Sequence, residues 1–335
     1  MTLVSVIIPC YNEQATIRQL LEAIAGQTYP RPQLEVILAD GRSSDATRQQ
    51  IQAYAAAHPN LSIQLVDNPA RTIPAGLNAA VRAAHGEIIV RLDGHAQPYP
   101  DYIQRAVDDL LAGLGENVGG AWEIQPGAPT RTARSIASAA AHPLGVGDAL
   151  YRHADRAGLV DTVPFGAFRR TLLDQVGGFD ETLLTNEDYE FNTRLRRSGG
   201  RIWLDPGIRS IYLARPTLGG LARQYARYGF WKARMLRRYP ASLRTRQALP
   251  PLFVASLLLG TLLAVFLPLV RVLLGLELLF YLLVLLAAGI GAAARERRPF
   301  QAVGLPAAIA IMHLCWGAGF LWSMIKGIFP SRKHA

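Results

Sequence analysis

A carboxylate and an imidazole lie two residues apart at the end of a short apolar segment. Asp93-Gly94-His95 closely follows Ile88-Ile89-Val90, a β-branched segment whose length favours a buried strand over a helix. In an open α/β sheet, ligands bind just beyond the carboxyl ends of the strands. Asp93 and His95 therefore predict a metal and diphosphate site, although for this tripeptide alone an ordinary turn at a strand end is the simpler interpretation.

Three earlier apolar segments also end in polar clusters. The segments are residues 3–8, 34–39 and 63–66, and the clusters that follow them are residues 9–13, 40–45 and 67–68. Helices are expected between them, with caps at Asn12 and at Ser44 or Asp45, and a third helix over 74–84. This alternation predicts an α/β domain with a mostly parallel sheet. Four polar strand ends in succession are typical of a nucleotide-binding sheet.

The remainder of the first 212 residues is less regular. The pattern predicts helices over 99–113 and 187–198 and a short strand over 201–204. Residues 118–168 show no clear period. Within them, an Ala-rich stretch at 133–141 and the glycines at 145 and 147 suggest a helix and a flexible loop over the site.

The positive charge of the chain belongs to its C-terminal part. The formal net charge is +10, yet residues 206–335 contain only two acids, Glu277 and Glu296, against 17 Lys and Arg residues. A basic segment of this kind suits either nucleic acid or an anionic membrane surface. Because the apolar runs lie in the same part of the chain, we expect membrane lipids as partners and no nucleic acid.

Three apolar runs of membrane length occupy residues 249–270, 272–294 and 302–325. They predict a transmembrane region over 249–326, preceded by basic amphipathic interfacial helices over 213–248. Arg295, Arg297 and Arg298 should be cytosolic, which agrees with a cytosolic front domain and a first hairpin that turns at Arg271. A third crossing would place Lys326, Arg332 and Lys333 outside, so the third run either crosses against this rule or is re-entrant or interfacial.

Five motifs occur in an order that resembles a known family. They are Pro9-Cys10-Tyr11-Asn12-Glu13, Asp40-Gly41-Arg42-Ser43-Ser44-Asp45, Asp93-Gly94-His95, Asn186-Glu187-Asp188 and Gln224-Tyr225-Ala226-Arg227-Tyr228. The set resembles inverting family 2 glycosyltransferases with a GT-A fold. The chain as a whole is similar to the membrane-bound bacterial glucosyltransferases that extend lipid-linked exopolysaccharide units, such as the succinoglycan type.

The resemblance implies a role for each motif. It places the general base on Asp188, where the alternative is a helix-start acid that complements the dipole. The implied metal ligands are Asp93 and His95 for Mn²⁺ or Mg²⁺, with direct phosphate contact as the alternative for His95. The implied nucleotide-sugar contacts are Pro9, Tyr11, Glu13, Asp40, Asp45, Arg71 and Asp93. The implied acceptor contacts are Phe165, Gly166, Glu187, Gln224, Arg227 and Tyr228.

Several of these residues also have ordinary structural interpretations. Asp45 could cap a helix, and Glu13 could be a first-turn helix acid. Arg71 could be an exposed loop residue. Gln224, Arg227 and Tyr228 resemble the QxxRW element of processive synthases with Tyr in place of Trp, and they could equally be headgroup contacts of an amphipathic helix.

The resulting expectation is a metal-dependent inverting hexosyltransferase at the inner (cytoplasmic) membrane, multi-pass, with its catalytic domain cytosolic. It would move a sugar, glucose, from a UDP-sugar to a polyprenyl-diphosphate-linked saccharide. One alternative is transfer to polyprenyl phosphate itself or processive chain growth. An alternative of another class is an inert nucleotide-sugar-binding scaffold of a membrane polysaccharide complex.

Overall fold

The computed structural model describes residues 2–328, which form two compact units. The first unit contains residues up to 123 together with 150–212, and the second contains 124–149 together with the chain from 213 onward. One boundary between the units follows residue 212. Residues 124–149 depart from the predicted division, because they group with the C-terminal part of the chain.

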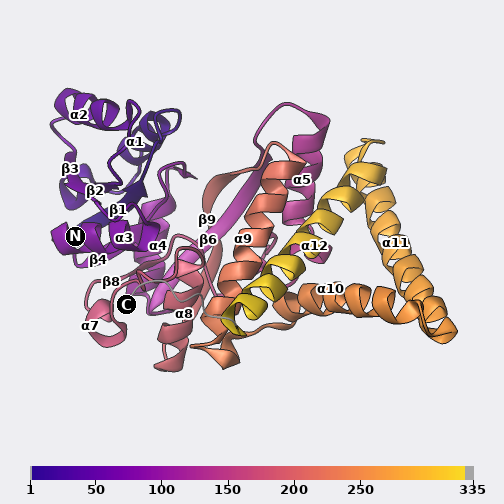
Figure 1. Cartoon of the computed structure of the whole chain (residues 1–335). Coiled ribbons are helices and arrows are strands. Elements are labelled where there is room, and N and C mark those ends of the chain that lie inside the picture. The colour runs from indigo at the N-terminus through magenta and orange to yellow at the C-terminus, as the bar shows by residue number, and fades with distance from the viewer. Residues whose placement is uncertain (1, 329–335) are drawn as a thin grey trace. The chain divides into compact units, whose positions relative to one another are not determined.

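The first unit begins with a parallel sheet whose strands alternate with helices (Figure 1). β1 (Val4–Cys10) pairs with β2 (Leu34–Asp40) and with β4 (Ile88–Arg91), and β2 pairs with β3 (Ser62–Asp67), all in parallel. The connecting helices are α1 (Ile17–Ala25), α2 (Thr47–Ala57) and α3 (Ile73–Ala83). The α/β class predicted from the sequence is confirmed, and the ends of β1, β2, β3 and β4 lie at one edge.

Beyond β4 the sheet continues with antiparallel strands, of which the sequence analysis predicted only the start of β9, at 201–204. The order is β3-β2-β1-β4-β8-β6-β9-β5, and β7 pairs with β9. These strands are β5 (Gln97–Pro98), β6 (Asn117–Pro126), β7 (Gly158–Leu159), β8 (Ala167–Arg169) and β9 (Ile202–Ala214).

Glycines conceal two of these strands in the sequence. Gly119 and Gly120 interrupt the apolar pattern of β6, but a Cβ at Gly120 would lie 1.6 Å from the carbonyl oxygen of Ile208. Glycine is therefore needed there for the strands to approach closely. Pro206-Gly207 has the composition of a turn, yet it lies inside β9, which is 13 residues long rather than the four predicted.

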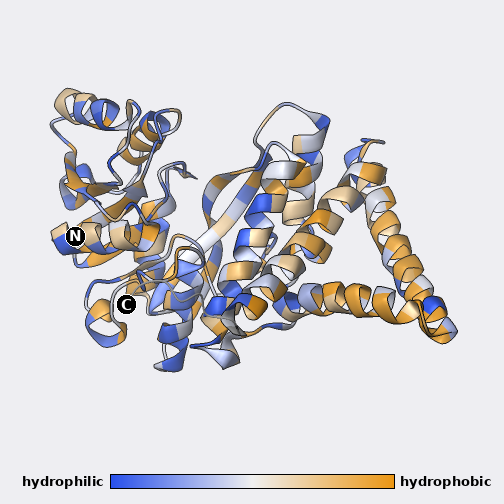
Figure 2. Cartoon of the chain, viewed as in Figure 1, coloured by the Kyte–Doolittle hydropathy of each residue, from blue (hydrophilic) through white to orange (hydrophobic). Residues whose placement is uncertain are grey.

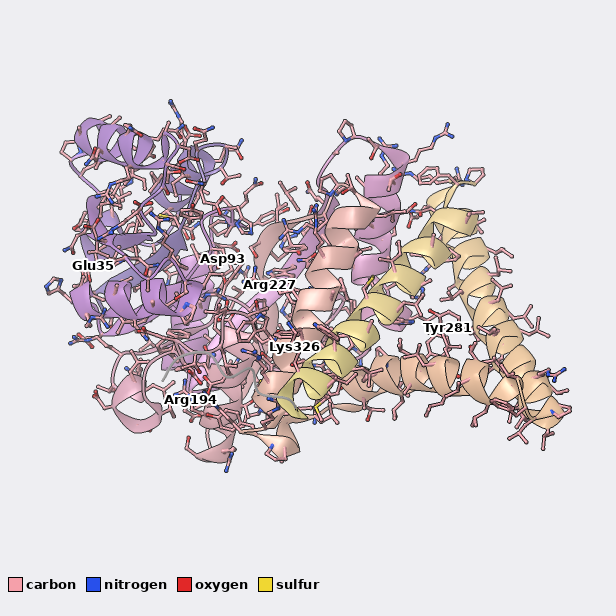
Figure 3. The ribbon with its side chains drawn as sticks, in the orientation of Figure 1. Glu35, Asp93, Arg194, Arg227, Tyr281 and Lys326 are labelled. Atoms are coloured by element: carbon pink, nitrogen blue, oxygen red, sulfur yellow. The ribbon has the colours of Figure 1, made fainter. Side chains whose placement is uncertain are left out.

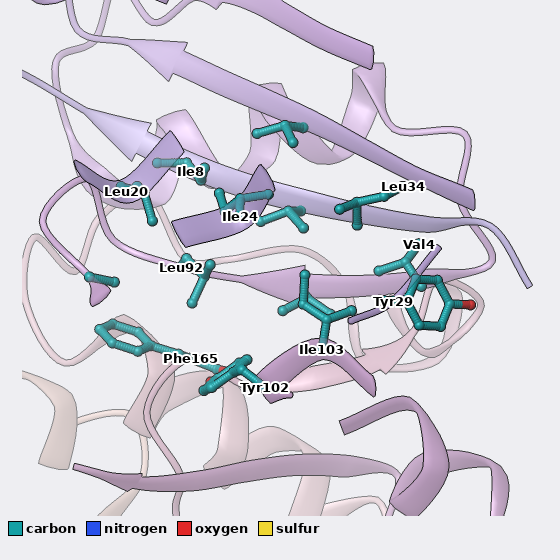
Figure 4. Close-up of a cluster of buried hydrophobic side chains, with 14 of the residues drawn as sticks. Val4, Ile8, Leu20, Ile24, Tyr29, Leu34, Leu92, Tyr102, Ile103 and Phe165 are labelled. Atoms are coloured by element: carbon teal, nitrogen blue, oxygen red, sulfur yellow. The ribbon is translucent and has the colours of Figure 1, made fainter. Parts of the chain in front are cut away.

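Alternating side chains of the strands form two cores, one on each face of the sheet. Figure 4 shows the first core, in which Val4 and Ile8 of β1 pack with Leu20 and Ile24 of α1. α4 (Tyr102–Leu111) completes it with Tyr102 and Ile103. The second core lies on the other face and contains Ile7, Ile37, Leu77, Ile89, Phe168 and Phe191. It brings α3, α7 (Leu172–Val176) and α8 (Glu187–Arg197) against the sheet.

The second unit is helical. It contains α5 (Arg131–Ala141), α6 (Pro143–Val146), α9 (Leu218–Leu236), α10 (Thr245–Ala264), α11 (Pro268–Glu296) and α12 (Gln301–Ile328). Within the described residues, α10, α11 and α12 are long and apolar enough to cross a membrane. Figure 2 shows that these helices consist mostly of hydrophobic residues.

The predicted position of the first C-terminal hairpin turn, at Arg271, is wrong. The first hairpin turns at residues 265–267, because Pro268 begins α11. Arg271 therefore lies inside α11, where its Nε donates to the carbonyl of Ala264 at 2.6 Å. Arg332 and Lys333 lie outside the described residues.

Within the basic segment predicted at 213–248, glycines allow the helix α9 to pack closely against the apolar helix α12. α9 packs along α12, where a Cβ at Gly229 would lie 2.1 Å from the carbonyl oxygen of Trp316. A Cβ at Gly319 would lie equally close to the carbonyl oxygen of Ala226. α5 also packs against α12, so the stretch predicted to form a loop over the site belongs to this helical unit.

Candidate active site

An arginine at the end of β4 organises the carboxylates of the site. Arg91 is 2% exposed, and its Nη2 donates to Asp93 at 2.8 Å and to Glu187 at 2.9 Å. Its Nη1 donates to Asp188. Since ionised side chains are rarely buried unless paired, Arg91 explains how three acids gather at one place. The structure therefore brings Asp93 together with Glu187 and Asp188, as the motifs predict; Figure 3 labels Asp93.

The electrostatics of this cluster give Asp188 a distinct proton affinity. Burial raises the pKa of Asp188 to about 7, with further increases from Glu187 and Asp93, against a lowering by Arg91. Burial also opposes the charge of Arg91, but the three carboxylates outweigh it and raise the pKa of Arg91. A carboxylate that titrates near pH 7 is suited to accept a proton and release it again.

Phe165 and Gly166 form the wall of the site before β8. Phe165 has a left-handed backbone (φ 52°), and its main chain hydrogen-bonds the Asp188 carboxylate. The carbonyl of Gly166 accepts a hydrogen bond from the backbone N–H of Arg91 at 3.1 Å. The ring of Phe165 lies 5.3 Å from the guanidinium carbon of Arg91. Both predicted acceptor residues thus contact the Arg91–Asp188 pair.

The loops after β1 and β2 are tied together by side chains. Asn12 has a φ of 55° and does not cap α1 as predicted, because the N-cap of α1 is Thr16. The Oδ1 atom of Asn12 instead accepts a hydrogen bond from the backbone N–H of Ser44 at 2.8 Å. Asp45 accepts from the backbone N–H of Thr47 at 3.0 Å and from that of Gln14 at 3.1 Å. Asp45 therefore holds both the start of α2 and the loop after β1.

Asp40 ends β2 and is fully buried. Its Oδ1 accepts from the hydroxyl of Ser43 at 2.5 Å, and its Oδ2 accepts from Nη1 of Arg48 at 2.8 Å. The same nitrogen donates to Asp67 at the end of β3 at 2.8 Å. Through Arg48, Asp40 thus links the end of β2 to the end of β3. That Asp40 contacts a nucleotide base stays a prediction.

Glu13, Gly94 and His95 lie side by side. His95 Nδ1 is 3.3 Å from Glu13 Oε1, and a Cβ at Gly94 would lie 2.9 Å from Glu13 Cγ. Asp93 uses Oδ1 to accept from Arg91, while its Oδ2 accepts no hydrogen bond from the residues that the structure describes. A carboxylate oxygen and an imidazole are ligand types that suit Mn²⁺, and the role of Asp93 and His95 as metal ligands stays a prediction. No group of three or more His, Cys, Asp or Glu that could hold a metal occurs among residues 2–328.

Pro9, Tyr11 and Arg71 lie in or beside the loops at this edge. Pro9 lies inside β1, beyond Ile7, the last β1 residue that pairs with β4. Tyr11 is 46% exposed, and a Cβ at Gly41 would contact its ring. Arg71 is exposed in the loop after β3.

Left-handed backbone at residues other than glycine concentrates around the site. Within the described chain, five of the six such residues lie in loops that follow β1, β2 and β3 or precede β8 and α8: Asn12, Arg42, Arg71, Phe165 and Asn186. A φ above zero is unfavourable for most L-residues, and such conformations cluster at functional sites.

Three predicted acceptor residues are not in the first unit. Gln224, Arg227 and Tyr228 lie on α9 of the second unit, where Gln224 Nε2 donates to the Tyr228 hydroxyl at 2.9 Å; Figure 3 labels Arg227. Their binding role stays a prediction. The sequence reasoning missed Arg91 and Arg48. A single charge inside the apolar segment at 88–92 was the available signal for Arg91.

The chain is similar to characterised proteins over most of its length. The family described as Glycosyl transferase family 2 matches residues 5–177, just over half of the chain. The succinoglycan biosynthesis protein ExoA of Rhizobium meliloti (strain 1021) is 32% identical over 317 residues, which cover 94% of this chain and 93% of that protein.

Two further similarities come from archaeal proteins. The dolichyl N-acetyl-alpha-D-glucosaminyl phosphate 3-beta-D-2,3-diacetamido-2,3-dideoxy-beta-D-glucuronosyltransferase of Methanococcus voltae is 25% identical over 337 residues, with 98% of each chain covered. The structure of the mannosyltransferase PcManGT from Pyrobaculum calidifontis, in complex with GDP-Man and Mn²⁺, has a TM-score of 0.62 and 22% identity. That match covers 99% of this chain and 88% of the other, and it shows a shared fold.

Proposed function

Because this chain belongs to glycosyl transferase family 2, we propose that it is an inverting enzyme of exopolysaccharide synthesis. It transfers a sugar, glucose, from a UDP-sugar to a polyprenyl-diphosphate-linked saccharide. The observation that supports the proposal is the Arg91 cluster, in which one guanidinium at the end of β4 binds both Asp188 and Asp93. In an open α/β sheet, ligands bind at this edge.

Asp188 acts as the general base. An inverting transfer is a single in-line displacement at the anomeric carbon, in which the bond to the UDP oxygen breaks as the bond to the acceptor oxygen forms. The acceptor hydroxyl proton passes to Asp188, and UDP leaves with the bonding electron pair. A positioned base contributes about 10²–10⁴-fold to the rate. Arg91 holds the carboxylate in place and, through its charge, favours the ionised form.

The donor lies over the ends of β1, β2 and β4. Pro9, Tyr11, Asp40, Asp45 and Arg71 supply the nucleotide contacts, and Glu13 supports His95 from the adjoining loop. A divalent cation would be held by Asp93 and His95 and would offset the charge that develops on the leaving diphosphate. Because imidazole is a poor ligand for Mg²⁺, the His95 position favours Mn²⁺.

The acceptor reaches the site at a membrane surface. Phe165, Gly166 and Glu187 line the acceptor side of the base, and Gln224, Arg227 and Tyr228 bind the lipid-linked part of the acceptor. Support for a lipid acceptor comes from three helices of membrane-spanning length in the described chain and from the name of the archaeal dolichyl-phosphate relative. Succinoglycan biosynthesis in the name of the bacterial relative supports the polysaccharide pathway.

The test is sugar transfer by the full-length protein in detergent, from radiolabelled UDP-glucose to membrane lipid extracts. Asp188→Asn should lower turnover at least about 100-fold, because Asn cannot accept the proton. Asp174→Asn is the matched control, since Asp174 is an exposed carboxylate of α7. Full transfer by Asp188→Asn would show that the base is another residue.

Two further measurements separate the alternatives. Removal of divalent ions should abolish transfer, Mn²⁺ should restore it better than Mg²⁺, and His95→Asp should shift the preference towards Mg²⁺. Lipid and product-length analysis distinguishes single addition to a saccharide from transfer to polyprenyl phosphate or processive growth. UDP binding without turnover, indifferent to metal, would instead identify a scaffold.

A further inference from the structure

Two buried polar atoms beside the base lack hydrogen-bond partners. Among the described residues, nothing accepts from Nε of Arg91 and nothing donates to Oδ1 of Asn117. Both side chains line the same small pocket, which Asp188 and Gly166 also line. A buried donor or acceptor without a partner is costly, so such atoms in a native protein are nearly always satisfied by water.

The direction of the Asn117 amide is fixed by a chain of hydrogen bonds. The carbonyl of Val163 can only accept, so it determines that Nδ2 of Asn192 donates to it at 3.1 Å. The Oδ1 atom of Asn192 then accepts from Nδ2 of Asn117 at 2.7 Å. This arrangement leaves the oxygen of Asn117, not its nitrogen, directed away from Asn192.

Gly166 keeps this oxygen accessible. A Cβ at Gly166 would lie 2.1 Å from Oδ1 of Asn117, so any other residue would displace the amide. The carbonyl of Gly166 meanwhile binds the backbone N–H of Arg91. The glycine therefore holds Arg91 and Asn117 on the two sides of one pocket.

We propose that an ordered water molecule occupies this pocket, accepting a hydrogen bond from Arg91 Nε–H and donating one to Asn117 Oδ1. Asn117 is then a positioning residue, because through the water it holds the guanidinium that binds Asp188. The pocket has room for about one water molecule and offers the two or more polar partners that a buried water needs. This inference rests on the proposed role of Asp188 as the base.

A pair of variants with the same shape tests the role of Asn117. Asn117→Thr keeps an oxygen towards the pocket, whereas Asn117→Val replaces it with a methyl group. If the water positions Arg91, Asn117→Val should have a kcat about 10-fold lower than Asn117→Thr, because the water loses its acceptor and no longer holds the Arg91 guanidinium in place. Their KM for UDP-glucose should agree, since Asn117 is not among the proposed donor contacts. Equal kcat values in the two variants would overturn the positioning role.

Thr162→Val serves as the control within the network. It removes the bond from Asn192 Nδ2 to the Thr162 hydroxyl, but Val163 still orients Asn192. Its kcat should stay within about 2-fold of the unmodified enzyme, and a loss as large as that of Asn117→Val would show that general packing, not the pocket, sets the rate.

A structure at about 2 Å resolution or better tests the water directly. Density between Arg91 Nε and Asn117 Oδ1 is expected, and its absence there would overturn the proposal. The two hypotheses fail separately. Full activity of Asp188→Asn would contradict the role of Asp188 as general base. If Asp188→Asn is inactive but Asn117→Thr and Asn117→Val have equal kcat values, only the positioning role of the water is contradicted.

Discussion

Replacing Arg91 by methionine should destabilise the first unit and abolish transfer. Methionine fills a similar volume but leaves Asp93, Glu187 and Asp188 without their shared cation. Breaking a buried ion pair from one side costs about 3–5 kcal/mol. For a domain of about 150–250 residues, each kcal/mol lowers Tm by about 2–4 °C, so we expect a decrease of roughly 6–20 °C.

The decrease should depend on pH in a defined direction. Burial already raises the pKa of Asp188 in the folded state, and without Arg91 the charge that lowers this pKa is lost, so it rises further above its value in the unfolded chain. The folded state then binds more protons, and stability falls as pH rises. The Tm difference from the unmodified enzyme should therefore be larger at pH 8 than at pH 5, as measured by scanning fluorimetry in detergent.

Arg194→Met is the matched control. Arg194 also binds a buried acid, because its Nε donates to Glu190 at 2.6 Å, but it does not contact the carboxylates of the site. This variant should lose stability while its transfer rate, measured well below its Tm, is retained. Arg91→Met should lose at least about 100-fold in rate at the same temperature. If Arg91→Met melted within about 2 °C of the unmodified enzyme and transferred sugar normally, the account of the cluster would be refuted.

Three other predictions concern single residues. The transfer rate should rise with pH up to about 7, because Asp188 must be ionised, and a flat profile between pH 5 and 8 would contradict this role. Despite the cost of burial, bonds from Ser5 and two backbone N–H groups lower the pKa of Glu35 in the folded state. The ionised Glu35 carboxylate therefore stabilises the folded state above about pH 4, and this stabilisation is lost as pH falls further. Glu35→Gln should remove this contribution to the acid dependence of Tm without changing the transfer rate. Gly166→Ala should cost about 1–3 kcal/mol and lower turnover, because the new methyl group would displace the amide of Asn117, and an unchanged Tm would count against this close approach.

The parallel half of the sheet could be predicted because its signals are local. Each apolar segment is short and β-branched, and each is followed by a polar turn and an amphipathic helix. The antiparallel half depends on contacts between distant segments, as where Gly120 meets Ile208. A glycine in a strand carries no apolar signal, so periodicity alone could not predict that part of the sheet.

The carboxylates of the site were identified by motif, but their arrangement was not. Asp188 and Arg91 are 97 residues apart in the sequence, and the acids at the start of α8 are explained locally by the helix dipole. Only the structure joins them to β4. Similarly, the arginines and aromatic residues of α9 predict an interfacial helix, while the contact of Gly229 with α12 fixes one face of it against another helix.

The charge balance of the cluster bears on the proposed role of a divalent cation. Arg91 carries one positive charge against three carboxylates, so the end of β4 keeps an excess of negative charge even when Asp188 is partly protonated. A diphosphate brought to this edge would be repelled unless further positive charge accompanied it. Arg42 and Arg71, in the loops after β2 and β3, are exposed. A divalent cation held by Asp93, as proposed, would supply positive charge that aids donor binding as well as offsetting the charge of the leaving diphosphate.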